Sequence, residues 1–173
     1  MSSTFSALLN ARLVFEEVSD PAVAPGVSAS AQGTVEASTG GRRWSNGAGS
    51  GQIGAAYRTM ATIGSGATDS YDLLAAGGLI GPLGEPIDLD ELKGLALRVT
   101  SGEVKFIRHG SNGIALFTSN NEGLQLKSSG GLRAVVLDFG PDGLDVTTDS
   151  KFEIVETSGA AAATYELAFI GAK

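Results

Sequence analysis

Short apolar or alternating runs, separated by turn sequences, fill residues 66–173, and this pattern restricts the fold more than any other feature of the chain. The separating segments, such as HGSNG, SSGG and GPDG, are rich in residues that favour turns. In one run, Tyr165, Leu167 and Phe169 alternate with polar or small residues, as in a strand with one buried face. The runs span residues 69–74, 92–100, 104–108, 114–118, 124–127, 132–138, 144–147, 151–156 and 164–170. Many short strands at this spacing predict a β-sandwich or barrel of about eight strands.

Composition supports an all-β fold. The chain contains 25 glycines, and glycine costs about 1 kcal/mol in a helix interior while it favours turns and bulges. Aromatic residues make up only 6% of the chain, so we expect a core built mainly from leucine, isoleucine, valine and alanine. The one helical signal, residues 88–93, is long enough for a single turn.

Residues 1–65 have a different character and are predicted to form an extended, glycine-rich N-terminal arm. Residues 11–17 are a plausible strand, but the sequence that follows is rich in proline, glycine, alanine and serine. Eight of the 27 residues from Gly40 to Gly66 are glycine. Such a segment buries too little apolar surface to offset its ordering entropy alone. We therefore expect an arm that lies against the body, residues 66–173, or against a neighbouring subunit.

The arm contains five aromatic or cationic side chains that are candidates for partner binding. They are Phe15, Arg42, Arg43, Trp44 and Tyr57. Trp44 and Tyr57 flank the glycine-rich stretch, and Trp44 is the only tryptophan of the chain.

The formal net charge of −7 arises entirely from the body. Residues 1–58 carry four basic and four acidic residues, whereas residues 59–173 carry eight basic and fifteen acidic ones. An acidic body repels nucleic acid and anionic membrane surfaces, so neither is a predicted partner. No apolar run approaches the ~18 residues that a membrane helix needs, and the first residues do not resemble a signal peptide. We expect synthesis in a cytoplasm.

No set of residues predicts catalysis or a cofactor. The chain has no cysteine, and its only histidine, His109, lies in a turn sequence, where an exposed loop histidine is the simpler interpretation. Two groups of carboxylates, at 88–91 and 142–149, lack the spacing of a calcium-binding EF-hand and are interpreted as turn residues. The segment GAGSGQIG lacks the Lys-Ser/Thr of a phosphate-binding loop and is interpreted as part of a flexible arm. We therefore predict no metal site, no cofactor and no enzymatic activity.

Several segments resemble small structural proteins of tailed bacteriophages. The resemblance covers residues 44–173 and includes WSNGAGSGQIGAAYR, TDSYDLLAAGGLIGPLGEPIDLDELKGLALRV and the closing ATYELAFIG. The matching residues are Tyr71, Asp72, Leu73, Gly78, Leu79, Pro82, Gly84, Lys93, Leu95, Leu97, Tyr165 and Ile170. The resemblance implies a jelly-roll form of the sandwich and a place in the virion.

The resemblance also implies a function, a capsid decoration or cement protein that binds the outer surface of the phage head. Its expected partners are the major capsid protein and further copies of itself, in a trimer or dimer. An alternative is a tail- or fibre-associated module that recognises a host surface. A glycan-cleaving jelly roll is a third, less favoured interpretation, because such sites usually carry more aromatic residues than this chain has.

Overall fold

The computed structural model describes residues 3–9, 13–19, 42–82, 84–120 and 122–173 of the 173-residue chain. In these residues the chain forms β-strands and one 3-10 turn, η1 (Ala75–Gly77). The strands are β1 (Ser3–Leu9), β2 (Leu13–Ser19), β3 (Arg42–Asn46), β4 (Gln52–Ile53), β5 (Ala55–Ile63), β6 (Thr68–Asp72), β7 (Glu91–Ser101), β8 (Glu103–Arg108), β9 (Gly123–Lys127), β10 (Ala134–Asp138), β11 (Leu144–Asp145), β12 (Lys151–Glu156) and β13 (Ala163–Ala172).

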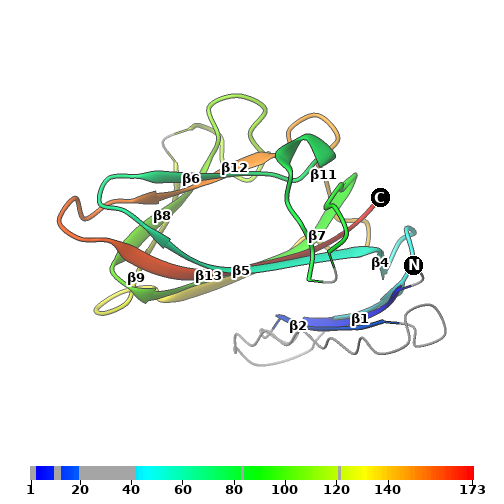
Figure 1. The fold of residues 1–173 in the computed structure, drawn as a ribbon. Helices are drawn as coiled ribbons and strands as arrows, with labels where there is room; N and C mark the ends of the chain where they lie inside the picture. The colour runs from blue at the N-terminus through cyan, green and yellow to red at the C-terminus, as the bar shows by residue number, and fades with distance from the viewer. Residues whose placement is uncertain (1–2, 10–12, 20–41, 83, 121) are drawn as a thin grey trace.

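Two antiparallel sheets face each other and form a β-sandwich (Figure 1). The first, called the β13 sheet, has the order β10-β7-β13-β5, with β11 also paired to β7; the second, the β12 sheet, has the order β6-β12-β8-β9. Eight strands remain from β5 onward when the two-residue strand β11 is left out. The first of them, β5, pairs with the last, β13, in one sheet, and the second, β6, pairs with the seventh, β12, in the other. This is the strand order of a jelly roll. The predicted jelly-roll-like sandwich is confirmed.

The centre of the β13 sheet is β13 itself, which pairs with β5 on one side and with β7 on the other. The ladder with β7 contains a register shift, because Ile170 lies opposite Gly94 whereas Gly171 lies opposite Leu92. Lys93 is the extra residue at this irregularity, and such a bulge redirects a side chain out of the regular alternation. The consequence for Lys93 is described with the candidate site.

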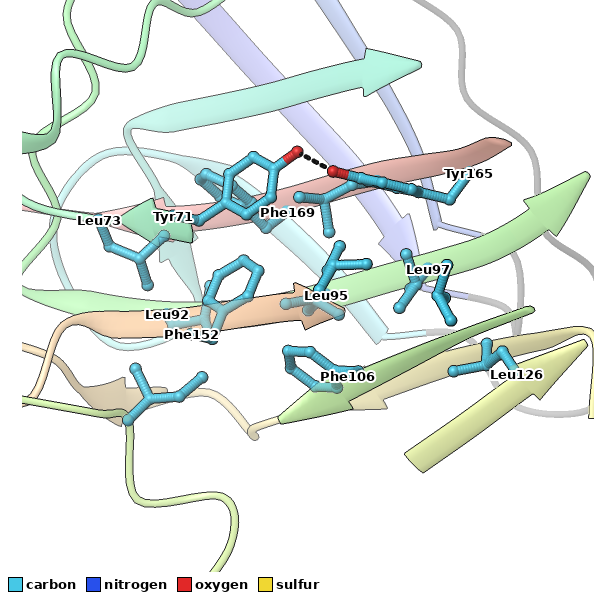
Figure 2. Packing of buried hydrophobic residues seen from close by; sticks show 14 of the residues in the cluster. Tyr71, Leu73, Leu92, Leu95, Leu97, Phe106, Leu126, Phe152, Tyr165 and Phe169 are labelled. Atoms are coloured by element: carbon cyan, nitrogen blue, oxygen red, sulfur yellow. Dashed lines mark hydrogen bonds between the residues drawn. The ribbon is translucent and has the colours of Figure 1, made fainter. Parts of the chain in front are cut away.

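The core lies between the two sheets, and the predicted alternation of inward residues is confirmed for β7 and β13. Leu95, Leu97 and Val99 of β7 and Tyr165, Leu167 and Phe169 of β13 are all buried there. From the β12 sheet, Phe152 stacks on Tyr71, with ring centroids 5.2 Å apart, and meets Phe106 edge-on at 5.3 Å (Figure 2). The aromatic residues are few, but they are concentrated at the centre of the sandwich.

A pair of tyrosine hydroxyls joins the two sheets inside the core. The hydroxyl oxygens of Tyr71 in β6 and Tyr165 in β13 are 2.6 Å apart (Figure 2). Tyr165 donates to the Asp69 carboxylate at 2.5 Å, so it accepts its second hydrogen bond from Tyr71. Burial raises the pKa of Tyr71 to about 12, and burial together with the bond to Asp69 raises the pKa of Tyr165. Both hydroxyls therefore remain protonated and able to donate at neutral pH.

The predicted boundary between arm and body, at residue 66, is wrong in the structure. β5 lies within the predicted arm, yet it pairs with β13 from Ala55 to Ile63 and forms one edge of the main sheet. The predicted helical turn at residues 88–93 is also wrong, because buried Leu89 lies in chain without regular secondary structure and β7 begins at Glu91. Residues 114–118, predicted as a strand, form turns, and the chain there is tied to β12 by the bond from Ile114 N–H to the Lys151 carbonyl oxygen.

One buried carboxylate, Glu156, connects the loop between β5 and β6 to the loop between β12 and β13. It accepts hydrogen bonds from the hydroxyl of Ser158 and from the backbone N–H groups of Gly66 (2.7 Å), Ser158 (2.6 Å) and Gly159 (3.1 Å). The bond from the Ser158 hydroxyl, followed by the backbone bonds, lowers the pKa of Glu156 from 4.5 to about 2. The ionised carboxylate therefore holds the β5–β6 and β12–β13 connections together.

This geometry gives a pH-dependent prediction for stability. Because the folded-state pKa of Glu156 lies below its unfolded value of 4.5, its stabilisation is complete above that pH and is lost as the pH falls toward 2. In urea titrations, the stability gap between the wild type and Glu156→Gln should be largest at neutral pH and close as the pH approaches 2. A gap that stays constant over this pH range would contradict the assigned role.

Candidate functional site

The N-terminal strands form a small third sheet, with the order β2-β1-β3-β4, which we call the N-terminal sheet. β1 and β2 are a hairpin ladder that runs from the Ser3–Ser19 pair to the Leu9–Leu13 pair. β3 joins β1 antiparallel, with Trp44 opposite Ala7. The N-terminal sheet lies beside the outer face of the β13 sheet, on the side away from the β12 sheet (Figure 1). The described part of the predicted arm is therefore largely β-sheet.

Two apolar side chains, Trp44 and Ile53, attach the N-terminal sheet to the body. Trp44 is 3% exposed and Ile53 is fully buried, and both belong to a cluster on the outer face of the β13 sheet. The cluster also contains Ala56 of β5, Ala96 of β7 and Ala168 of β13. Alanines on neighbouring strands leave a flat surface, and an indole ring fits closely on such a surface.

The glycine-rich turn between β3 and β4 adds backbone bonds to this attachment. The N–H of Gly51 donates to the carbonyl oxygen of Pro141 at 2.8 Å, and just after β4 the N–H of Gly54 donates to that of Gly171 at 2.9 Å. Gly47 adopts a φ of +140°, and a side chain there would collide with the amide group of Gln52. The interpretation of this segment as part of a flexible arm is therefore wrong, because its backbone is bonded to the body.

Lys93 reinforces the same junction from inside the protein. Its side chain is fully buried, although it carries a charge, because the bulge in β7 turns it toward the loop between β10 and β11. The ammonium group pairs with Glu91 and donates to the carbonyl oxygen of Pro141 at 2.8 Å. That oxygen also accepts the bond from Gly51, so one carbonyl connects β7, the β10–β11 loop and the glycine-rich turn. A buried ammonium needs partners of this kind to offset its lost hydration.

Four of the five predicted partner-binding residues lie in strands of the N-terminal sheet, and Trp44 is one of them. Phe15 lies in β2, and Arg42 and Arg43 begin β3. β1 is the strand between them, so the three residues belong to one continuous sheet. The side chains of these three residues lie outside the described part of the structure.

Trp44 and Tyr57 have roles within the protein itself. Trp44 anchors the N-terminal sheet, as described above. Tyr57 points into the sandwich, where its ring stacks on Phe169 at a centroid distance of 4.8 Å and meets Tyr71 edge-on at 6.3 Å. Its position between Ala55 and Thr59 in an alternating segment is the signal that could have identified it as a core residue.

Two polar residues of the turn sequences, His109 and Asp145, have local partners. His109 is partly exposed, and its Nδ1 accepts from the backbone N–H of Ser111 at 2.9 Å while Nε2 lies 3.6 Å from Glu153. Asp145 accepts from the backbone N–H and the hydroxyl of Thr147, and these bonds lower the pKa of its carboxyl. These contacts are those of turn residues.

Neither a metal-binding group nor a membrane-spanning helix is found in the described part of the chain. No three histidine, aspartate or glutamate side chains there are grouped as ligands for a metal ion. None of its helical segments has the length and apolar character needed to span a bilayer.

Comparison with known proteins gives no family assignment. No family model and no curated protein matches the chain.

Proposed function

We propose that this protein is a structural component of a tailed-bacteriophage virion, a capsid decoration or cement protein that binds the outer surface of the head and stabilises it. Its partners in this proposal are the major capsid protein and further copies of itself. The protein needs no cofactor and performs no catalysis in this role. It is made in the host cytoplasm and then joins the virion.

The observation that carries the proposal is the N-terminal sheet held on the outside of an acidic jelly roll. Within the described residues, β2 pairs only with β1, so the other edge of β2 offers unpaired backbone groups. Such an edge can add a strand from another protein, and this is a common way to join subunits. Phe15 lies on this edge strand, and Arg42 and Arg43 lie two strands away. The sandwich provides a soluble support, while the N-terminal sheet provides the contact.

The charge distribution supports the same division of roles. The excess of acidic residues lies in residues 59–173, whereas residues 1–53, which include the N-terminal sheet, carry three basic and four acidic residues and are nearly balanced in charge. Copies that carry an excess of one charge repel each other through their bodies and stay dispersed before assembly. The nearly neutral N-terminal segment can approach a shell with little of this electrostatic repulsion.

The proposal is tested by mixing the purified protein with phage heads that lack decoration. We expect saturable co-sedimentation with the heads and a higher temperature of head disruption. Binding to tail fractions or to host glycans, without binding to heads, would instead favour the tail- or fibre-associated module. Turnover of a glycan substrate would contradict the non-enzymatic assignment.

A triple variant tests the N-terminal sheet directly. Phe15→Ala combined with Arg42→Ala and Arg43→Ala should weaken head binding by about tenfold or more, because aromatic and arginine side chains dominate many interfaces. Arg133→Ala is the matched control, since it removes an exposed arginine from the turn between β9 and β10. The melting temperatures of all variants should show that the sandwich is intact. Full occupancy by the triple variant would contradict a role for the N-terminal sheet.

A further inference from the structure

The four sheet edges of the sandwich are not equally protected against pairing with another strand. β6 and β9 have five residues each, and β6 carries Asp69 and Asp72 while β9 ends at Lys127. β10 also has five residues and is followed by the loop that contains Pro141. Short strands, charges and proline are the usual protection of sheet edges. Three of the four edges therefore have such protection.

β5 is the exception. It has nine residues, contains no proline and no acidic residue, and carries a single charged side chain, Arg58. Within the described residues its only ladder is the one with β13, so its other side is open. Met60, in the middle of the strand, is 70% exposed and is the most exposed large apolar side chain among those described. A long, regular edge with an exposed apolar centre is a template for another strand.

The loop between β6 and β7 defines how much of this edge is open. A side chain at Gly81 would lie 3.1 Å from the carbonyl oxygen of Ala56, so the loop passes directly beside the start of β5. The adjacent residue, Ile80, is 54% exposed. The open part of the strand therefore runs from Tyr57 to Ile63, and its central residue is Met60.

We infer that the β5 edge pairs antiparallel with the β5 edge of a second copy of this chain, about a two-fold axis near Met60. This pairing sets Arg58 opposite the partner's Thr62, so no like charges meet across the axis. The two β13 sheets then form one continuous sheet. The interface is isologous and closes as a dimer, which is the commonest symmetric assembly. The inference goes beyond the head-binding role, since it names the self-association surface.

A second copy fits this edge because the open segment is compatible with itself in antiparallel register, where Met60 meets Met60 and Arg58 meets an uncharged threonine. Its ends, Tyr57 and Ile63, are equally far from the centre, so both copies use their whole open length. The partner's β5 would end beside the loop at Ile80, which adds apolar contact at each end of the interface. The strand lacks acidic residues, so acidic bodies approach here with little repulsion between the strands.

Sedimentation equilibrium of the full-length protein over a wide concentration range tests the inference. We expect a reversible monomer–dimer equilibrium. Met60→Lys places two cations near the axis and should weaken dimerisation at least ~10-fold without affecting the fold of the monomer. Leu132→Lys, at a position 50% exposed on the turn between β9 and β10, is the matched control and should dimerise like the wild type. A monomer at every concentration, or an oligomer that Met60→Lys leaves unchanged, would overturn the inference.

Amide hydrogen exchange provides a second readout that does not depend on mass. Alternate amides of an edge strand point away from its only neighbour and exchange quickly. In the dimer, the outward amides between Tyr57 and Ile63 should become protected as concentration rises, and Met60→Lys should remove this protection. Equal exchange in dilute and concentrated samples that do associate would show that another surface is used. Both measurements use the protein alone, so a failure to bind heads leaves their outcome unaffected.

Discussion

Replacing Phe152 by alanine is expected to lower the free energy of unfolding by about 3–5 kcal/mol. The side chain is fully buried in β12 and lies at the centre of the aromatic contacts between the two sheets. Its ring stacks on Tyr71 and meets both Phe106 and Phe169 edge-on, the latter at a centroid distance of 6.5 Å. The substitution removes this contact area and leaves a cavity that the paired strands on either side prevent from closing.

Phe152→Leu is the matched control for this prediction. Leucine keeps much of the buried volume, so we expect a cost under about 1.5 kcal/mol. Thermal and urea unfolding of the two variants should therefore differ clearly, and the alanine variant should melt roughly 10–20 °C below the wild type. Similar losses for both variants would mean that ring contacts, rather than cavity volume, determine the stability at this position.

The same physical logic explains which strands could be predicted from the sequence. β12 was predicted with the bounds that the structure has, Lys151–Glu156, because large apolar residues alternate with charged ones along it. β13 was predicted nearly as well, for the same reason. In both strands one face is buried by bulky side chains, and this produces a clear period of two. Sequence alone was sufficient where the buried face is built from large residues.

β5 was missed because three small residues accompany the two large ones, Tyr57 and Ile63, on its inward face. Ala55, Thr59 and Ala61 carry little hydrophobic signal, and glycines lie close to both ends of the strand. The strand exists because β13 pairs with it along nine residues that are about 100 positions away in the chain. A partner so distant in sequence adds nothing to the local pattern, which is weak in this strand.

The attachment of the N-terminal sheet could not be predicted for a similar reason. Trp44 was recognised as an exceptional residue, but its binding surface is built from alanines that are spread over β5, β7 and β13. Alanine occurs in any structural context, so such a surface is visible only when the strands are side by side. The structure places the contact of Trp44 within its own chain.

The buried charge at this junction leads to the other large expected effect, because Lys93 has two functions in the structure. Its aliphatic chain fills space beside Gly143, where an added Cβ would lie 2.9 Å from the Lys93 Cδ atom. Its ammonium group bonds to Pro141, which also holds Gly51. A substitution can remove both functions or only the second one.

Lys93→Ala removes both functions and should cost about 2–4 kcal/mol, since it leaves a cavity and deprives the Pro141 carbonyl of one donor. Lys93→Met keeps the volume and removes only the charge, and Glu91 is partly exposed to solvent, so we expect a loss under about 1.5 kcal/mol. Urea unfolding measures these losses. The fluorescence of Trp44, the only tryptophan, reports separately on the attachment of the N-terminal sheet. If the charge itself held the junction, both variants would change this fluorescence equally; if packing holds it, only the alanine variant will.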